Sequence, residues 1–310
     1  MTASTNETQR FLAWQQELDQ SLIRGASPHA SNVLHQLKQV SKARSSSNPQ
    51  RDTRLAALEE IVPAYLSLVK SIPQVSPLPS EATLSPLVDK LNAYLDLLEG
   101  QAGRTFISQS DFKTSVIPDF FLRVFASLIQ ARALPLSVVG QREIPIRLSF
   151  DPKRKGFLVP HLQRVDMAIV LFAELSVNKV EHEGFCIPLF AAESKTYFDK
   201  NMISGVDFSV RTLKSTFPDC VYLAIGERSD FDLKGVNYAN SAIDEIVILR
   251  RQKRSDYRKS GLGSPIATDL VAEVVARAVS VLDVFQETRP DLSMRIGGGK
   301  LIGHSRKRGK

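Results

Sequence analysis

The chain has 310 residues, of which 43% are apolar, with 16 glycines, 16 prolines and two cysteines. This composition is typical of a soluble globular protein with two domains or one large domain, and it excludes collagen-like and wholly disordered chains. The chain has only the cysteines Cys186 and Cys220, too few for a disulfide framework or a four-cysteine zinc site. The N-terminus is polar and no apolar run approaches about 20 residues, so we expect a cytoplasmic protein without a membrane span.

The formal net charge of +7 is concentrated in two segments. Residues 249–259 and residues 286–310 each have a strong excess of lysine and arginine over acidic residues. Such local basicity is typical of a surface that binds a polyanion, including nucleic acid. The alternative is a solvated helix end and a solvated tail.

The first hundred residues favour helices separated by linkers. An apolar stripe from Thr53 to Ile72 is interrupted at Pro63, because proline cannot donate the helical hydrogen bond. Linkers are expected at residues 44–50 and between Pro73 and Pro79. An earlier stripe repeats at helical spacing through Phe11, Trp14, Leu18 and Leu22.

A third helix in this region has the clearest end signals. Ser85 is the expected N-cap, Pro86 the first helical residue, and Gly100 the residue that ends the helix. Leu87, Leu91, Tyr94 and Leu98 line one face.

Beyond about residue 105 the pattern changes to short apolar runs. Pro118 is expected to open a helix, and two more helices are expected over residues 203–217 and 269–285. Pro145 and Pro188 favour an edge or a bulge in their strands. The expected strands are Glu143–Phe150, Val165–Phe172, Phe185–Ala192, Cys220–Gly226 and Ala242–Leu249.

This order of elements predicts an α/β fold with a mixed sheet and helices on both faces. We expect a helical N-terminal region over residues 1–104, used for recognition or dimerisation. The sheet domain is expected over residues 105–285, followed by a basic flexible tail over residues 286–310.

Three polar side chains at the ends of apolar runs could carry chemistry. Glu193 and Lys195 are two residues apart, so on a strand they point to the same face. The segment VNKVEHEG lies midway between Asp166 and Glu193. If the two runs pair as an antiparallel hairpin that turns there, the two carboxylates meet at its open end.

Two carboxylates held together repel each other unless a cation lies between them. Ligation by oxygen alone suits Mg²⁺, and the carbonyl of Ser194 could add a ligand. Lys195 could then orient an attacking water and stabilise charge on phosphorus. These parts fit phosphodiester hydrolysis without a covalent intermediate. The alternative is a surface hairpin with a solvated Glu–Lys pair.

The same residues resemble the PD-(D/E)xK nuclease superfamily. Asp166 takes the place of its Asp, and Glu193-Ser194-Lys195 takes the place of its E-x-K. AAESKTYFDKNM and the following VDFSVRTLKSTFPDCVYLAIGE resemble type II restriction endonucleases, notably the group cutting CCTNAGC-like sites. Val165 stands where the superfamily has a proline.

The resemblance extends over about residues 105–250 and implies several expectations. It implies a mixed-sheet nuclease core, a requirement for Mg²⁺, and double-stranded DNA as substrate. A homodimer or a heterodimer with a related subunit is implied as well. SQSDFKTSVIPDFFLRVF resembles a segment of that group in which an acidic residue opens a helix, so Asp119 is a candidate fourth metal ligand, in place of the glutamate expected there.

We therefore expect a Mg²⁺-dependent, site-specific DNA endonuclease. Two alternatives are a DNA-binding protein without catalysis and a structure-specific repair or junction nuclease on the same fold. The basic segment after the last expected strand is the candidate DNA contact. Its cations are Arg250, Arg251, Lys253, Arg254, Arg258 and Lys259.

Overall fold

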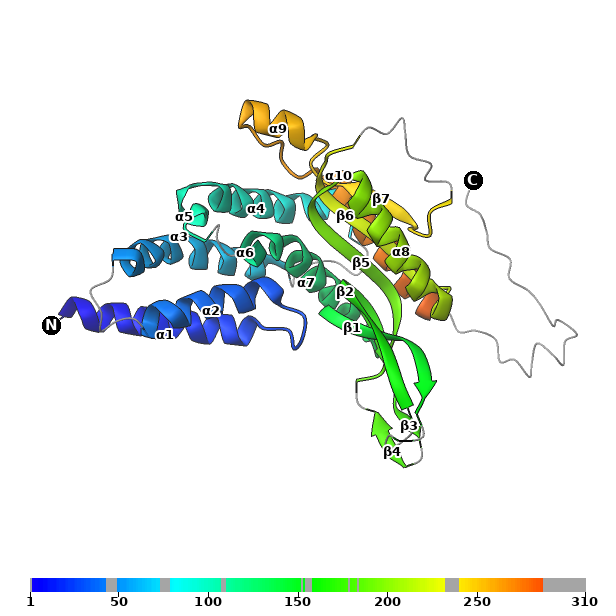
Figure 1. The fold of residues 1–310 in the computed structure, drawn as a ribbon. Coiled ribbons are helices and arrows are strands. Elements are labelled where there is room, and N and C mark those ends of the chain that lie inside the picture. The colour runs from blue at the N-terminus through cyan, green and yellow to red at the C-terminus, as the bar shows by residue number, and fades with distance from the viewer. Residues whose placement is uncertain are drawn as a thin grey trace, which may run out of the picture.

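The computed structural model describes residues 2–42, 49–72, 79–106, 110–151, 153, 158–177, 179–182, 184–231 and 240–286. The basic tail predicted for residues 286–310 lies outside them from residue 287 on, as do most of the two expected linkers. The first half of the chain is helical (Figure 1). Its helices are α1 (Thr2–Ser21), α2 (Pro28–Lys42), α3 (Pro49–Ser71), α4 (Glu81–Glu99), α5 (Gln101–Arg104), α6 (Ser110–Thr114) and α7 (Val116–Ala131).

Two expectations about helix boundaries in this region are wrong. Helix α4 begins at Glu81, because Ser80 and Thr83 form a reciprocal capping box ahead of the expected start at Ser85. Pro86 therefore lies inside the helix, whereas Gly100 ends it as expected. Helix α3 runs through Pro63 without interruption, since the buried side chains on either side of the proline hold both halves in the core.

The second half builds the expected mixed sheet, in the order β1-β2-β5-β6-β7. Strands β1 and β2 and strands β2 and β5 pair antiparallel, whereas β6 runs parallel to β5 and to β7. Pro145 lies at a register shift in the edge strand, and Pro188 borders a shift in β5. The strands are β1 (Ser137–Phe150), β2 (Leu158–Phe172), β5 (Cys186–Phe198), β6 (Val221–Ser229) and β7 (Glu245–Ile248).

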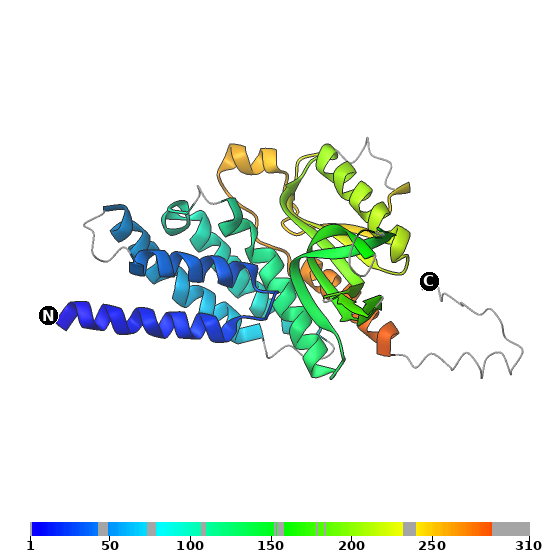
Figure 2. The same cartoon turned by 60° about the horizontal axis from the view of Figure 1, so that its bottom comes forward.

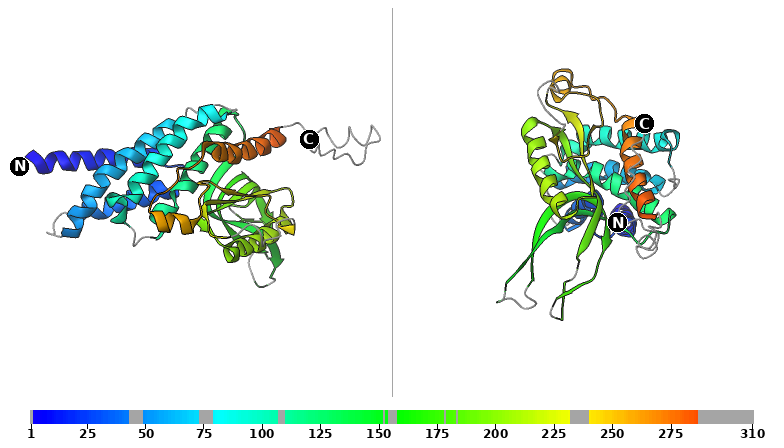
Figure 3. Two further views of the ribbon diagram at one scale, coloured as in Figure 1. Left: turned by 90° about the horizontal axis from the view of Figure 1, so that it is seen from above. Right: turned by 90° about the vertical axis from the view of Figure 1, so that its right-hand side faces the viewer.

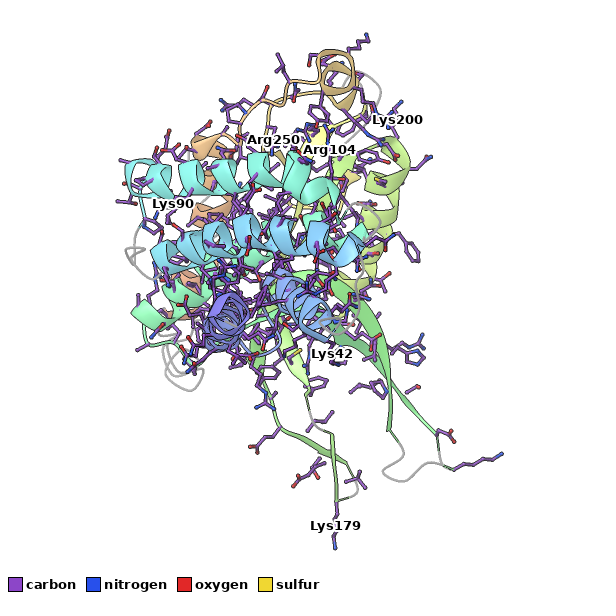
Figure 4. The ribbon with its side chains drawn as sticks, turned by 90° about the vertical axis from the view of Figure 1, so that its left-hand side faces the viewer. Lys42, Lys90, Arg104, Lys179, Lys200 and Arg250 are labelled. Carbon is purple, nitrogen blue, oxygen red and sulfur yellow. The ribbon has the colours of Figure 1, made fainter. Side chains whose placement is uncertain are left out.

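Two β-arms project from the body of the molecule (Figure 3). One is the outer part of the β1–β2 hairpin. The other is a separate two-stranded sheet of β3 (Leu175–Val177) and β4 (Val180–His182), inserted between β2 and β5. Lys179 lies at the far end of this second arm (Figure 4).

Helices cover both faces of the sheet, as expected, and Figure 2 shows the sheet between α8 (Lys200–Thr216) and the helical half. Side chains of α8 pack on one face with Ala168, Ala191 and Tyr222. On the other face α7 and α10 (Thr268–Gln286) join a hydrophobic core that contains Ile169 and Phe190 and continues through α1 to α4. This core crosses residue 104 without a break.

The short helices α5 and α6 were not expected, and neither was a third one that follows the last strand. Helix α9 (Arg254–Ser260) follows β7, and Gly261 ends it in the left-handed conformation with φ of +68°. Within the described ranges, no helix combines the length and apolar character that crossing a bilayer requires.

Candidate active site

The antiparallel pairing of β2 and β5 brings Asp166 and Glu193 together. The last pair of the β2–β5 ladder is Met167 opposite Ala192. Asp166 directly precedes Met167 and Glu193 directly follows Ala192, so the two acids lie beside each other at the end of the ladder. The backbone N–H of Ser194 donates to Asp166 Oδ2 over 2.9 Å, which ties the Asp166 carboxylate to β5. The connection turns between β3 and β4, within the polar stretch expected from the sequence.

Lys195 joins the two carboxylates. Its Nζ lies 2.6 Å from Glu193 Oε1 and 3.8 Å from Asp166 Oδ2. All three side chains are partly exposed, so the group is open to a substrate at the surface. Glu193 and Lys195 project to the same side of β5 because side chains two residues apart on a strand share a face.

The electrostatics of the group show an excess of negative charge. Burial, and then the Asp166 charge, raise the pKa of Glu193 above its usual range against the opposing effect of Lys195. Burial alone would lower the pKa of Lys195, but its hydrogen bond to Glu193 and the charges of both acids raise that pKa. Two carboxylates therefore share the single ammonium of Lys195. A further cation would relieve the repulsion between the two carboxylates.

The donor set suits a hard divalent cation. Mg²⁺ binds through one or two carboxylates and keeps several waters or substrate oxygens. Asp166, Glu193 and the Ser194 carbonyl would supply such ligands. Over the residues that the structure describes, no group of three or more His, Cys, Asp or Glu side chains is arranged around a metal site.

Asp119 does not join this pair, contrary to the expectation that it is a fourth ligand. It is 2% exposed in the first turn of α7, where its carboxylate pairs with Arg123 at 2.7 Å. Tyr65 Oη donates to it over 2.6 Å, and the His29 backbone N–H donates over 3.3 Å. These partners engage the carboxylate within the helical half of the molecule.

The basic segment after β7 has two parts, and Arg250 is not the surface residue that was expected. Its guanidinium is 1% exposed and pairs with Glu227 at 3.1 Å. Arg250, which is labelled in Figure 4, also donates to the Ser264 carbonyl, and Glu99 lies 3.9 Å away. Arg250 therefore anchors the segment inside the protein.

The other cations of this segment lie outside the core. Arg251 pairs with Asp269, and the Arg254 guanidinium lies 3.5 Å from the centre of the Tyr197 ring. Lys253, Arg258 and Lys259 are exposed.

Sequence reasoning missed Arg164, an exposed residue on β2 whose charge acts on both Glu193 and Lys195. The signal was present, since Arg164 precedes Asp166 by the two-residue repeat of a strand. The buried network around His29 was also missed, because its members come from separate helices.

Comparisons with known proteins show a partial family match and a shared fold. A family model described as Bpu10I restriction endonuclease matches residues 167–261, a span that contains Glu193 and Lys195 and begins directly after Asp166. A solved structure described as the native BbvCI A2B2 tetramer superposes with a TM-score of 0.63 at 22% sequence identity. The match covers 82% of this chain and 98% of that chain, so the two share a fold. No curated protein matches the chain.

Proposed function

We propose that this chain is a site-specific double-stranded DNA endonuclease, a type II restriction enzyme that hydrolyses phosphodiester bonds with Mg²⁺. The observation that carries the proposal is the convergence of Asp166, Glu193 and Lys195 where β2 and β5 meet. The match of residues 167–261 to the Bpu10I restriction endonuclease family and the fold shared with BbvCI support it.

In this proposal each side chain has a separate task. Asp166, Glu193 and the Ser194 carbonyl hold Mg²⁺, which when bound polarises a phosphoryl oxygen and acidifies water. The Ser194 N–H fixes the orientation of the Asp166 carboxylate. Lys195 stays protonated because both acids raise its pKa. Its ammonium can therefore orient the attacking water and stabilise the charge that develops on phosphorus.

The proposal includes DNA contacts and an assembly. Lys253, Arg258 and Lys259 on and beside α9 are exposed cations that would position the enzyme on phosphates. Since the structure described as BbvCI is an A2B2 tetramer, we propose that this chain also works with a second subunit, either a copy or a related chain. Two strands of a duplex need two cuts, which two subunits would supply.

The experiment is a digest of several unrelated plasmids with the purified full-length chain, with Mg²⁺ and with EDTA. We expect discrete fragments with Mg²⁺ and none with EDTA. The variants Glu193→Gln and Lys195→Ala should each lower the cleavage rate at least about 10²-fold, because each removes a group that acts in the transition state. Glu174→Gln is the matched control, since Glu174 is an exposed glutamate in the connection that leads from β2 to β5.

Each other outcome selects an alternative. Salt-sensitive DNA binding without any Mg²⁺-dependent product would favour a non-catalytic DNA-binding protein. Cleavage of branched DNA alone would favour a junction nuclease. Full cleavage by Glu193→Gln or Lys195→Ala would refute the assigned site. If the chain needs a different subunit, cleavage should appear only when that subunit is added.

A further inference from the structure

Arg164 is a cation beside the candidate active site, and the described residues give its side chain no partner. It lies on β2 two residues before Asp166, so the strand repeat directs both side chains to the same side, about 7 Å apart along the strand. Within the described part of the chain, its guanidinium makes no ion pair or hydrogen bond. Glu143 lies directly opposite in the β1–β2 register, yet no ion pair joins the two.

A groove of about 780 Å³ reaches the same side chain. It lies between the two β-arms, which Figure 3 shows side by side. Its walls include Pro145, Leu148, Leu162, Leu175 and Phe185, with Arg142 and Arg164 as the cations. Arg142 is engaged, because it donates to the Gly184 carbonyl and lies over the Phe172 ring. Among the described residues of this wall, Arg164 is thus the cation that is left to bind a ligand.

The charge of Arg164 reaches the candidate active site. It lowers the pKa of Glu193 and also that of Lys195, so it acts through space on both. The group of two carboxylates and one ammonium has a net charge of −1, and the guanidinium brings it to zero. An approaching phosphodiester is an anion, so the added positive charge of Arg164 favours its binding beside the two carboxylates.

We propose that Arg164 binds a non-bridging oxygen of the phosphodiester that is cut, as a further catalytic residue beside Asp166, Glu193 and Lys195. This rests on the proposed nuclease function. The planar guanidinium fork offers paired N–H donors that match phosphate oxygens, which a lysine ammonium does not. Its charge would be most valuable as the phosphorus centre gains negative charge.

The test compares Arg164→Ala and Arg164→Lys with Arg147→Ala. Arg147 is the matched control, since it is an exposed arginine of the same hairpin, located farther along the arm opposite His161. Single-turnover cleavage of a duplex containing the cut site is measured with Mg²⁺. We expect Arg164→Ala to slow the reaction about 10²-fold. Arg164→Lys should retain part of the rate through its charge, and Arg147→Ala should stay near the wild type.

A second measurement shows whether Arg164 touches the phosphate. Affinity is measured in EDTA for the same duplex and for one with an uncharged methylphosphonate at the cut position. The methylphosphonate should lower the DNA affinity of the wild type and of Arg147→Ala. It should lower the affinity of Arg164→Ala little further, because that variant already lacks the contact with the phosphate.

The outcomes separate this inference from the proposed function. If the wild type cuts and Arg164→Ala cuts like Arg147→Ala, the role of Arg164 is refuted and the nuclease stands. The role is also refuted if the methylphosphonate costs Arg164→Ala as much affinity as the wild type. If the wild type cuts no DNA, alone or with a second subunit, both proposals fall.

Discussion

His29 is wholly buried, yet both of its ring nitrogens have partners. Nδ1 lies 3.0 Å from Ser115 Oγ and Nε2 lies 2.6 Å from Tyr94 Oη. Tyr65, Tyr94 and Phe112 contact the ring edge to face. Burial lowers the pKa of His29 to about 4, although the nearby Asp119 charge opposes that shift. The helical half is therefore built around a neutral histidine.

This predicts an acid-sensitive stability. Because the folded-state pKa lies below the ordinary 6.5, the unfolded chain takes up a proton first as the pH falls. The contribution of neutral His29 to the free energy of unfolding is fully present above pH 6.5 and is lost as the pH falls toward about 4. The loss amounts to about 3 kcal/mol, since each pKa unit corresponds to about 1.4 kcal/mol. Urea unfolding at a series of pH values measures it.

The matched variant is His29→Gln, which cannot titrate but keeps a donor and an acceptor. It is expected to be less stable at pH 7 and to show a flatter dependence of the unfolding free energy on pH between 6.5 and about 4, the range set by the His29 pKa. Equal slopes for the two proteins would contradict the assignment to His29.

The local positions of the candidate active-site residues were predictable because they follow from strand geometry alone. The midpoint of Asp166 and Glu193 indicated the turn, and the two-residue repeat placed Lys195 beside Glu193. The environment of Asp119 was not predictable in this way. Its partners Tyr65 and His29 lie 54 and 90 residues away, and only the packing of separate helices brings them together.

At the scale of elements, β7 and the segment after it show how one basic run can divide into two roles. The buried pair of Arg250 and Glu227 joins that segment to β6, and Arg228 lies 3.7 Å from the same Glu227 carboxylate. Arg228 also lies over the Tyr257 ring of α9 at 3.9 Å. These interactions fix the base of α9 and leave the cations along it exposed.

We expect different consequences when these cations are removed. Arg250→Ala should destabilise the protein by about 3–5 kcal/mol, because Glu227 would lose its close partner inside the protein. The slope of log binding constant against log salt concentration should not change. By contrast, Lys253→Ala, Arg258→Ala and Lys259→Ala should leave stability within about 0.5 kcal/mol. Each of these three substitutions that removes a cation bound to a DNA phosphate should reduce the slope by about 0.9.

Urea unfolding and DNA titrations at several salt concentrations measure the two effects. A lower salt slope in Arg250→Ala at full stability would contradict its structural role. Unchanged slopes in all three α9 variants would place the DNA elsewhere on the surface.

The elements of the sheet were largely predictable, since each strand is a short apolar run bounded by polar residues. The ends were less so. Strand β1 begins at Ser137 and not at Glu143, because pairing with β2 continues along residues that carry no apolar alternation. Helix α9 was hidden because a charged run without a buried face gives no helical stripe.

Considered as a whole, the molecule has a hydrophobic core that continues across residue 104, where the sequence suggests a boundary. The Phe125 ring of α7 meets the Phe190 ring of β5 edge to face at 5.2 Å, within a core that also includes α1 to α4. Polar contacts cross the same position. Asn92 on α4 exchanges two hydrogen bonds with the backbone of Ile266, and Glu99 lies 3.4 Å from Arg228.

This continuity predicts that the helical half and the sheet unfold together. The chain provides a separate probe for each part. Trp14 is the single tryptophan and lies in α1, whereas Cys186 at the start of β5 and Cys220 directly before β6 are both buried. In urea, the change in Trp14 fluorescence and the exposure of the two thiols to a labelling reagent should have the same midpoint. Residues 105–286 expressed alone should not fold, because they would expose one apolar face of the sheet and leave Arg228 without Glu99. A loss of Trp14 structure at lower urea, with both thiols still protected, would instead mean that the sheet is an independent domain.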